Sequence, residues 1–326
     1  MTVLSTNIDA VDSPDRSIFS GRRMSTRDVL VLAGGPGSER EVSLQSGKAV
    51  AEALTRLAFR PSLRDISPND LSALDESTDF AFIALHGEFG EDGTVQAELE
   101  RRGIPYCGTG PQSSQLAMNK VDAKRCFIDH QLPTPEFLVV RKPHSEDALR
   151  QFGVPAVVKP VTAGSSVDTF IAKTTKALVE YTALVAERYG EALLERYIKG
   201  RELTVGILGE EALPVCEIRT HREFYDYQAK YVDEDTQYLF DLDLSPALLR
   251  GVQETALAAH RALGCEVFSR VDIMLDEETR DPFLLEVNTI PGFTSHSLVP
   301  KAAARNGISF DELCRRIIEL SLSVRG

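Results

Sequence analysis

A short, continuous apolar run near the start of the chain narrows the choice of fold more than any other segment. Residues 29–33 are all apolar and stop at Gly34-Gly35-Pro36-Gly37, which predicts a buried strand followed by a tight loop. A helix capped by Ser43 is expected next, and residues 80–85 then form a second buried strand that ends at His86. Strand, helix and strand in this order predict a parallel sheet whose ligands lie beyond the carboxyl ends of the strands.

Length and composition limit the class of protein. A chain of 326 residues is expected to form two or three domains, and 43% hydrophobic and 26% charged residues argue against disorder. A net charge of −13 repels a phosphate backbone, so nucleic acid is not an expected partner. No apolar run approaches the roughly 20 residues that span a bilayer, so no membrane association is expected. Five scattered cysteines without a CxxC pair point to free thiols in a reducing compartment, the cytoplasm.

The chain divides into a tail and three further parts. Residues 1–27 are polar and are predicted to be disordered, and a start of the working protein at Met24 is a hypothesis. An N-terminal α/β domain is expected over 28–111. A central part (112–208) and a C-terminal part (209–326) of mixed strands and helices follow.

Four polar side chains near the C-terminus carry the strongest chemical signal. Period-two alternation in the strand predicted over 267–273 places Arg270 and Asp272 on one face. The same alternation in the next predicted strand places Glu286 and Asn288 on one face. The two strands are expected to form a hairpin.

The register of this hairpin decides what the polar face can bind. In a symmetric hairpin, Leu275 faces Phe283 and Asp272 faces Glu286. Two carboxylates opposite one another repel unless a positive charge lies between them. Together with Asn288 they are hard oxygen ligands, which suit magnesium with bound phosphates. An ordinary solvent-facing side of a sheet remains an alternative interpretation.

Two lysines and a small-residue loop could bind phosphate. Lys159 ends an apolar strand and precedes the loop Gly164-Ser165-Ser166, whose backbone N–H groups can surround an anion. Lys120 offers a second positive charge. Taken without context, however, both lysines are more simply interpreted as solvated side chains and the loop as a plain turn. Residues 220–243, rich in charge and tyrosine, are predicted to be a long functional loop.

These segments together resemble the D-alanine–D-alanine ligases of the ATP-grasp superfamily. The resemblance runs from Asp28 to about Ser323. It rests on the ordered segments 34–43, 86–93, 159–166, 200–205, 225–231, 270–272 and 286–297. It implies an α/β fold with an α+β C-terminal part. The N-terminal domain would be a parallel-sheet domain like that of biotin carboxylase, and 220–243 would be a mobile lid.

The resemblance also implies a reaction. ATP would phosphorylate one D-alanine, and a second D-alanine would attack the acyl phosphate to give D-alanyl-D-alanine for peptidoglycan synthesis. The expected cofactors are two Mg²⁺ or Mn²⁺ ions, and the expected assembly is a homodimer. A ligase joining D-alanine to D-lactate or another D-amino acid is an alternative, as is an inactive nucleotide-binding homologue.

Site residues carried over from the family fall into four groups. The catalytic group would be Glu39, Ser165, Tyr231, Arg270 and Gly292. The substrate-binding group would be Glu39, His86, Lys230, Ser297 and Leu298. The ATP-binding group would be Lys120, Lys159, Ser165, Ser166, Glu195, Tyr197, Ile198, Glu202 and Lys230. The metal ligands would be Asp272, Glu286 and Asn288.

One departure from the family pattern falls beside the phosphate loop. Asp168 stands where the family usually has glycine. It adds a negative charge and removes backbone freedom, and is therefore expected to alter ATP affinity.

Overall fold

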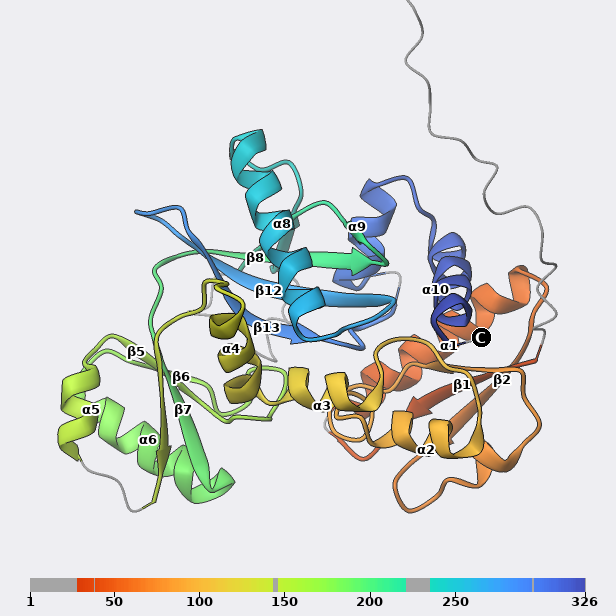
Figure 1. Cartoon of the computed structure of the whole chain (residues 1–326), viewed down its shortest axis with the longest axis horizontal. Helices are drawn as coiled ribbons and strands as arrows, with labels where there is room; N and C mark the ends of the chain where they lie inside the picture. The colour runs from red at the N-terminus through yellow and green to blue at the C-terminus, as the bar shows by residue number, and fades with distance from the viewer. Residues whose placement is uncertain (1–27, 38, 143–145, 221–234, 295, 326) are drawn as a thin grey trace, which may run out of the picture.

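The chain forms three sheets that lie side by side, with helices packed against each (Figure 1). The computed structural model describes residues 28–37, 39–142, 146–220, 235–294 and 296–325. The predicted tail and the question of a start at Met24 lie outside these residues. The two lid residues singled out above, Lys230 and Tyr231, lie outside them as well.

The first sheet is the predicted parallel sheet. Its strands lie in the order β2-β1-β3, and both pairings are parallel. The strands are β1 (Asp28–Gly34), β2 (Arg60–Ile66) and β3 (Phe80–Ile83). The accompanying helices are α1 (Arg40–Arg56), a 3-10 turn (Ser72–Asp75) and α2 (Thr94–Arg102). The loops after β1 and β3 therefore meet at one edge of the sheet, as the sequence predicted.

The predicted cap of α1 is wrong. The helix begins at Arg40, so Ser43 lies inside its first turn. The Ser43 hydroxyl accepts a hydrogen bond from the N–H of Gly34 at 2.8 Å and donates one to the carbonyl of Ala84 at 2.7 Å. This buried hydroxyl therefore links the ends of β1 and β3 through two main-chain groups and does not cap the helix.

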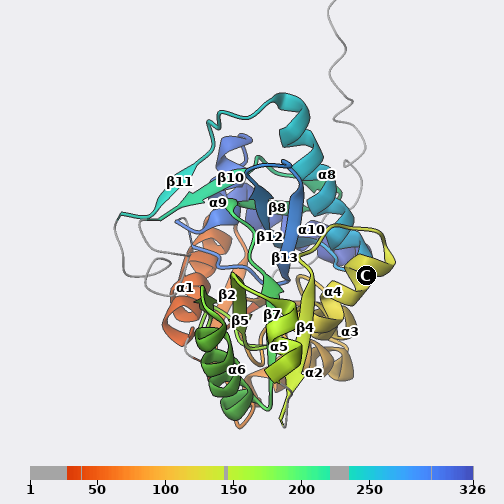
Figure 2. The ribbon, with the colours of Figure 1, turned by 90° about the vertical axis from the view of Figure 1, so that its left-hand side faces the viewer.

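The second sheet is antiparallel and has the strand order β4-β7-β5-β6. Helices α5 and α6 belong to this part of the molecule, and α6 packs against β5, β6 and β7 (Figure 2). The strands are β4 (Phe137–Arg141), β5 (Ala156–Lys159), β6 (Phe170–Ala172) and β7 (Glu191–Arg196). The helices are α5 (Glu146–Phe152) and α6 (Thr175–Tyr189).

The third sheet holds the predicted hairpin. Its order is β11-β10-β8-β12-β13, with β9 paired to β8. The strands are β8 (Gly200–Leu208), β9 (Glu211–Ala212), β10 (Cys216–Arg219), β11 (Gln237–Leu239), β12 (Phe268–Asp276) and β13 (Pro282–Asn288). The helices are α8 (Pro246–Ala262), α9 (Leu298–Arg305) and α10 (Phe310–Arg325). Strand β11 corrects the prediction of an unbroken loop over 220–243, because it gains main-chain partners on β10.

Two short helices connect the first sheet to the others. They are α3 (Pro111–Met118) and α4 (Lys120–Asp129). The side chain of Asn119 accepts hydrogen bonds from the N–H groups of Val121 and Asp122 and so caps α4. This cap fixes the start of α4, whose first residue is Lys120.

The domain boundaries remain proposals, and the sheets suggest one change to them. Strand β8 lies inside the range 112–208, yet it pairs along its whole length with β12 of the third sheet. We propose that the central part ends between β7 and β8. The cavity described below lies at this junction.

A buried histidine gives the third sheet a pH-dependent stability. His260 on α8 has its Nδ1 atom 2.7 Å from Ser269 Oγ, and burial lowers its pKa from 6.5 to about 4. As the pH falls from 6.5 to 4, the unfolded chain binds a proton that the folded chain does not. The free energy of unfolding should therefore fall by up to about 3 kcal/mol over this range.

Urea unfolding of wild type and H260N at several pH values tests this expectation. Asparagine keeps a polar group near Ser269 but does not titrate, so the variant should lose most of the slope between pH 6.5 and 4. Equal slopes in the two proteins would contradict the assignment to His260.

Candidate active site

The hairpin of β12 and β13 places the two predicted carboxylates opposite one another. Asp272 pairs with Glu286, as the symmetric register predicted. The predicted pairing of Leu275 with Phe283 is wrong, because Leu275 pairs with Pro282. A register shift between Asp272 and Ile273 accounts for the difference. Such a bulge changes the pairing toward the turn of the hairpin and leaves Asp272 opposite Glu286.

Hydrogen bonds hold Asp272 from three sides. Thr204 Oγ1 on β8 donates to its Oδ1 atom at 2.7 Å. Arg270 donates to the same carboxylate through Nε at 2.9 Å and Nη2 at 2.7 Å. Asn288 Nδ2 donates to Oδ2 at 3.1 Å. Asp272 is nearly buried, so this network keeps its charged carboxylate in one orientation.

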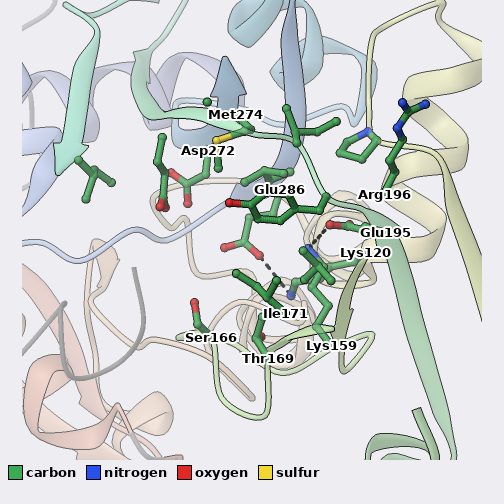
Figure 3. A pocket seen from close by; sticks show the side chains of 18 of the residues that line it. Lys120, Lys159, Ser166, Thr169, Ile171, Glu195, Arg196, Asp272, Met274 and Glu286 are labelled. Atoms are coloured by element: carbon green, nitrogen blue, oxygen red, sulfur yellow. Dashed lines mark ion pairs between the residues drawn. The ribbon is translucent and has the colours of Figure 1, made fainter. Parts of the chain in front are cut away.

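A cavity of about 420 Å³ lies between the second and third sheets. Lys120 and Lys159 approach it from the side of the second sheet, and Glu286 and Asp272 from the hairpin (Figure 3). Lys120 Nζ lies 3.2 Å from Glu286 Oε2 and donates to the carbonyl of Ala163 at 2.9 Å. Also on its wall are Ser166, Glu195, Tyr197, Ile198 and Glu202, all from the predicted ATP-binding group.

Glu195 is a buried carboxylate held by two lysines. Lys159 Nζ lies 2.9 Å from its Oε2 atom and Lys124 Nζ lies 2.8 Å from its Oε1 atom. Burial opposes ionisation of Glu195, but the two positive charges outweigh it and lower the pKa of the carboxyl. The structure therefore ties Lys159 to the cavity wall through an ionised glutamate.

The sequence interpretation missed Lys124. Its side chain is fully buried, donates to Thr134 Oγ1 at 2.7 Å, and burial lowers its pKa to about 8. A signal was present, because Lys120 and Lys124 are four residues apart on the helix face that also carries Phe127. A lysine in an apolar stripe is a candidate for a buried ion pair.

Replacing Lys124 with methionine should destabilise the protein by about 3 kcal/mol, because Glu195 loses one of two partners in a buried site. We also expect a higher KM for ATP, since the wall of the cavity would rearrange. Urea unfolding and steady-state kinetics measure the two effects. The control is K48M, which changes an exposed lysine on α1. Similar stabilities of K124M and K48M would contradict the prediction.

Glu39 and Ser165 come together from distant parts of the chain. Ser165 Oγ donates to Glu39 Oε1 at 2.6 Å, although 126 positions separate the two residues. Glu39 occupies the N-cap position of α1, but its side chain makes no capping hydrogen bond. The Glu39 side chain therefore does not cap this helix. This contact joins the loop after β1 to the loop between β5 and β6 of the second sheet.

His86 lies buried beneath the same junction. Its ring nitrogens lie 3.0 Å from Ser46 Oγ and 3.0 Å from the carbonyl oxygen of Ile290. Burial lowers the pKa of His86, so its ring is neutral at pH 7. Burial raises the pKa of nearby Glu91, and the charge of Glu39 adds to this effect.

A second cavity of about 340 Å³ adjoins this cluster. Glu39, His86, Ser165 and Arg270 line it together with Gly292, Ser297, Leu298 and Asn288. Leu298 is the first residue of α9, so the N-terminus of that helix faces the cavity and favours a negative group there. A Cβ atom on Gly292 would lie 3.1 Å from Ser297 Oγ, so glycine leaves room beside that hydroxyl.

The three predicted metal ligands lie together, but by themselves they do not form a complete metal site. Within the described ranges, no cluster of three or more His, Cys, Asp or Glu side chains is placed to hold a metal ion. Asp272 and Glu286 supply two carboxylates, and Asn288 supplies an amide beside them. This donor set suits Mg²⁺ only if phosphate or water oxygens complete the coordination.

The sequence matches two family profiles. Residues 127–319 match the profile described as the D-ala D-ala ligase C-terminus, which covers more than half of the chain, and residues 62–109 match the corresponding N-terminus. The chain belongs to the D-alanine–D-alanine ligase family. The predicted family and ATP-grasp fold class are thereby confirmed.

Named members of this ligase family resemble the chain over most of its length. The D-alanine–D-alanine ligase of Albidiferax ferrireducens is 41% identical, covering 98% of this chain and 94% of the relative. That of Nitrosomonas europaea is 43% identical over 91% of this chain and 99% of the relative. The crystal structure of the Bacillus anthracis D-alanine–D-alanine ligase complexed with ATP matches this structure with a TM-score of 0.80. The two sequences are 35% identical, and the match covers 92% of this chain and 99% of that chain.

The two cavities divide the predicted ligase site. Most of the described predicted ATP-binding residues line the first cavity together with Asp272 and Glu286. The described predicted substrate-binding residues line the second cavity together with Asn288. The roles of these residues stay predictions, and Lys230 and Tyr231 of this ligase-family site are not described. None of the described helices is long and apolar enough to cross a bilayer.

Proposed function

We propose that the chain joins two D-alanine molecules into D-alanyl-D-alanine at the cost of one ATP, for peptidoglycan synthesis. The observation that carries this proposal is the carboxylate pair of Asp272 and Glu286, which lines the first cavity. Hydrogen bonds join Asp272 to Arg270 and Asn288, which line a second cavity of different character. One cavity holds lysines suited to phosphates. The other holds an arginine and a helix N-terminus suited to carboxylates.

The first step forms an acyl phosphate. A carboxylate oxygen of the first D-alanine attacks the γ-phosphorus of ATP, and the bond between the β- and γ-phosphates breaks to release ADP. We propose that Lys120 and Lys159 hold the phosphates and that the backbone around Ser165 and Ser166 surrounds them. Glu39, fixed by Ser165, accepts the ammonium group of the first D-alanine.

The second step forms the peptide bond. The amine of the second D-alanine attacks the acyl carbon, and the tetrahedral intermediate then expels phosphate. Arg270 and Gly292 line the second cavity, and we propose that the Arg270 side chain and the N–H of Gly292 stabilise the negative charge that develops on the former carbonyl oxygen. Ser297 and the N–H of Leu298 receive the carboxylate of the second D-alanine.

We assign Asp272, Glu286 and Asn288 as ligands of two Mg²⁺ or Mn²⁺ ions. When bound, these ions would neutralise charge on the ATP phosphates. The hydrogen bonds from Thr204 and Arg270 hold Asp272 in position for this role.

One assay tests the ligase against its alternatives. The purified chain is incubated with ATP and Mg²⁺, and ADP release is measured with no amino acid, with D-alanine, and with D-alanine plus D-lactate. We expect release with D-alanine alone and D-alanyl-D-alanine as product. Release only when D-lactate is added would point to a depsipeptide ligase, and no release in any arm would overturn the proposal.

The assembly and the cell compartment are further parts of this proposal. We propose a homodimer formed through the N-terminal domain and a cytoplasmic location, where ATP is available. The dimer rests on the resemblance to the family, and the location rests on that resemblance and on the scattered free cysteines. Light scattering should give twice the monomer mass, and a monomer at micromolar concentration would contradict the dimer.

A further inference from the structure

The Asp168 side chain does not line the cavity between the second and third sheets. Its Oδ2 atom accepts a hydrogen bond from Arg188 Nη1 at 2.5 Å and another from the Tyr189 hydroxyl at 2.6 Å. Arg188 and Tyr189 are the last two residues of α6, which packs against the second sheet (Figure 2). The negative charge expected to disturb ATP binding is therefore paired with an arginine at the end of α6.

The phosphate loop, defined here as residues 162–169, has an unfavourable backbone. Ser165, Ser166 and Asp168 have φ values of 52°, 54° and 52°. Left-handed conformations at non-glycine residues are energetically unfavourable and persist only where surrounding contacts hold them. Two main-chain hydrogen bonds close turns within the loop: the N–H of Val167 donates to the carbonyl of Gly164, and the N–H of Thr169 donates to the carbonyl of Ser166. Asp168 is the loop residue whose side chain reaches the rigid helix.

We propose that Asp168, Arg188 and Tyr189 form a latch that holds the phosphate loop ready for ATP. Asp168 is a positioning residue in this role, because it acts through Ser165 and Ser166. A loop already in place loses less conformational entropy when the nucleotide binds, so the latch raises nucleotide affinity. Arg188 has a second effect, since it neutralises the negative charge of Asp168 within the loop that we propose surrounds the phosphates.

Three substitutions separate the parts of the latch. Y189F removes one hydrogen bond and should raise the KM for ATP about threefold. D168G removes the whole latch but relieves the strained φ, and should raise KM about fivefold. R188A removes one hydrogen bond and leaves the carboxylate unneutralised, and because Arg188 is largely exposed the rise in KM should be about threefold. Asparagine tolerates a positive φ and can accept from both donors, so D168N should stay closer to wild type than D168G.

The readouts are KM for ATP, kcat, and the Kd for Mg²⁺ with a non-hydrolysable ATP analogue, measured by calorimetry. The latch predicts that KM and Kd rise together while kcat stays within about threefold. The control is R141A, which removes an exposed ion pair with Glu191 at another edge of the same sheet. The control should bind the analogue as wild type does.

Unchanged KM and Kd in D168G and R188A would overturn the latch. So would a lower melting temperature with unchanged Kd, because that is the result of a purely structural contact. An equal rise in Kd for R141A would also overturn it. The inference rests on the proposed function, but the two fail separately. Wild type that releases no ADP with D-alanine contradicts the function, whereas the Kd of the variants tests the latch without ligation.

Discussion

E286Q is expected to lower kcat by about a thousandfold while leaving the fold intact. Glu286 faces Asp272 across the hairpin, and Lys120 Nζ lies 3.2 Å from its Oε2 atom. Glutamine has nearly the same shape but lacks the negative charge that a divalent cation requires from this position. Losing one charged ligand near a transferring phosphoryl group costs several kcal/mol of transition-state stabilisation, which corresponds to this loss of rate.

ADP release at saturating D-alanine and ATP measures the effect, over a range of Mg²⁺ concentrations. The matched control is E277Q, which makes the same change in the turn of the same hairpin, where Glu277 pairs with Lys199 on the surface. The control should retain wild-type activity. The melting temperature of E286Q should stay close to wild type, because the change also relieves carboxylate repulsion with Asp272. A kcat within tenfold of wild type would remove Glu286 from the metal assignment.

The hairpin shows how far local patterns predict this site. Alternation along each strand was enough to place Arg270 with Asp272 and Glu286 with Asn288, because side chains on a strand have a fixed period of two. The same reasoning failed at Leu275, because a bulge adds one unpaired residue and alternation carries no signal for it. The functional end of the hairpin was therefore predicted better than its turn.

The roles of other residues depend on partners that lie far away along the chain, and local sequence patterns do not indicate these partners. The buried parallel strand over 29–33 was predicted from its apolar run, yet Ser43 was assigned as a cap when it links two loops. Lys124 was missed because its partner Glu195 is 71 positions away. The sequence showed the charge of Asp168, but the orientation of its side chain depends on hydrogen bonds with the end of α6. Polar groups inside a fold choose partners by proximity in space, which periodicity does not report.

R270M is expected to lower kcat by about a thousandfold, and R270K by about a hundredfold. Arg270 lines the second cavity beside Gly292 and also donates two hydrogen bonds to Asp272. Its planar guanidinium can hold Asp272 and still present N–H groups to an oxyanion. A lysine carries the charge but cannot do both, so it should recover only part of the rate.

Two roles of Arg270 predict different kinetics. If it stabilises the oxyanion, kcat falls in both variants while the Kd for the Mg²⁺–nucleotide complex changes less than about threefold. If it serves only to orient Asp272, nucleotide affinity and Mg²⁺ dependence should weaken as much as the rate. The control is R261M, since Arg261 on α8 pairs with Glu210 on the surface and should not affect turnover. Stabilisation of the developing negative charge by Arg270 is contradicted if R270M keeps a kcat within tenfold of wild type, or if the loss appears entirely as weaker nucleotide binding.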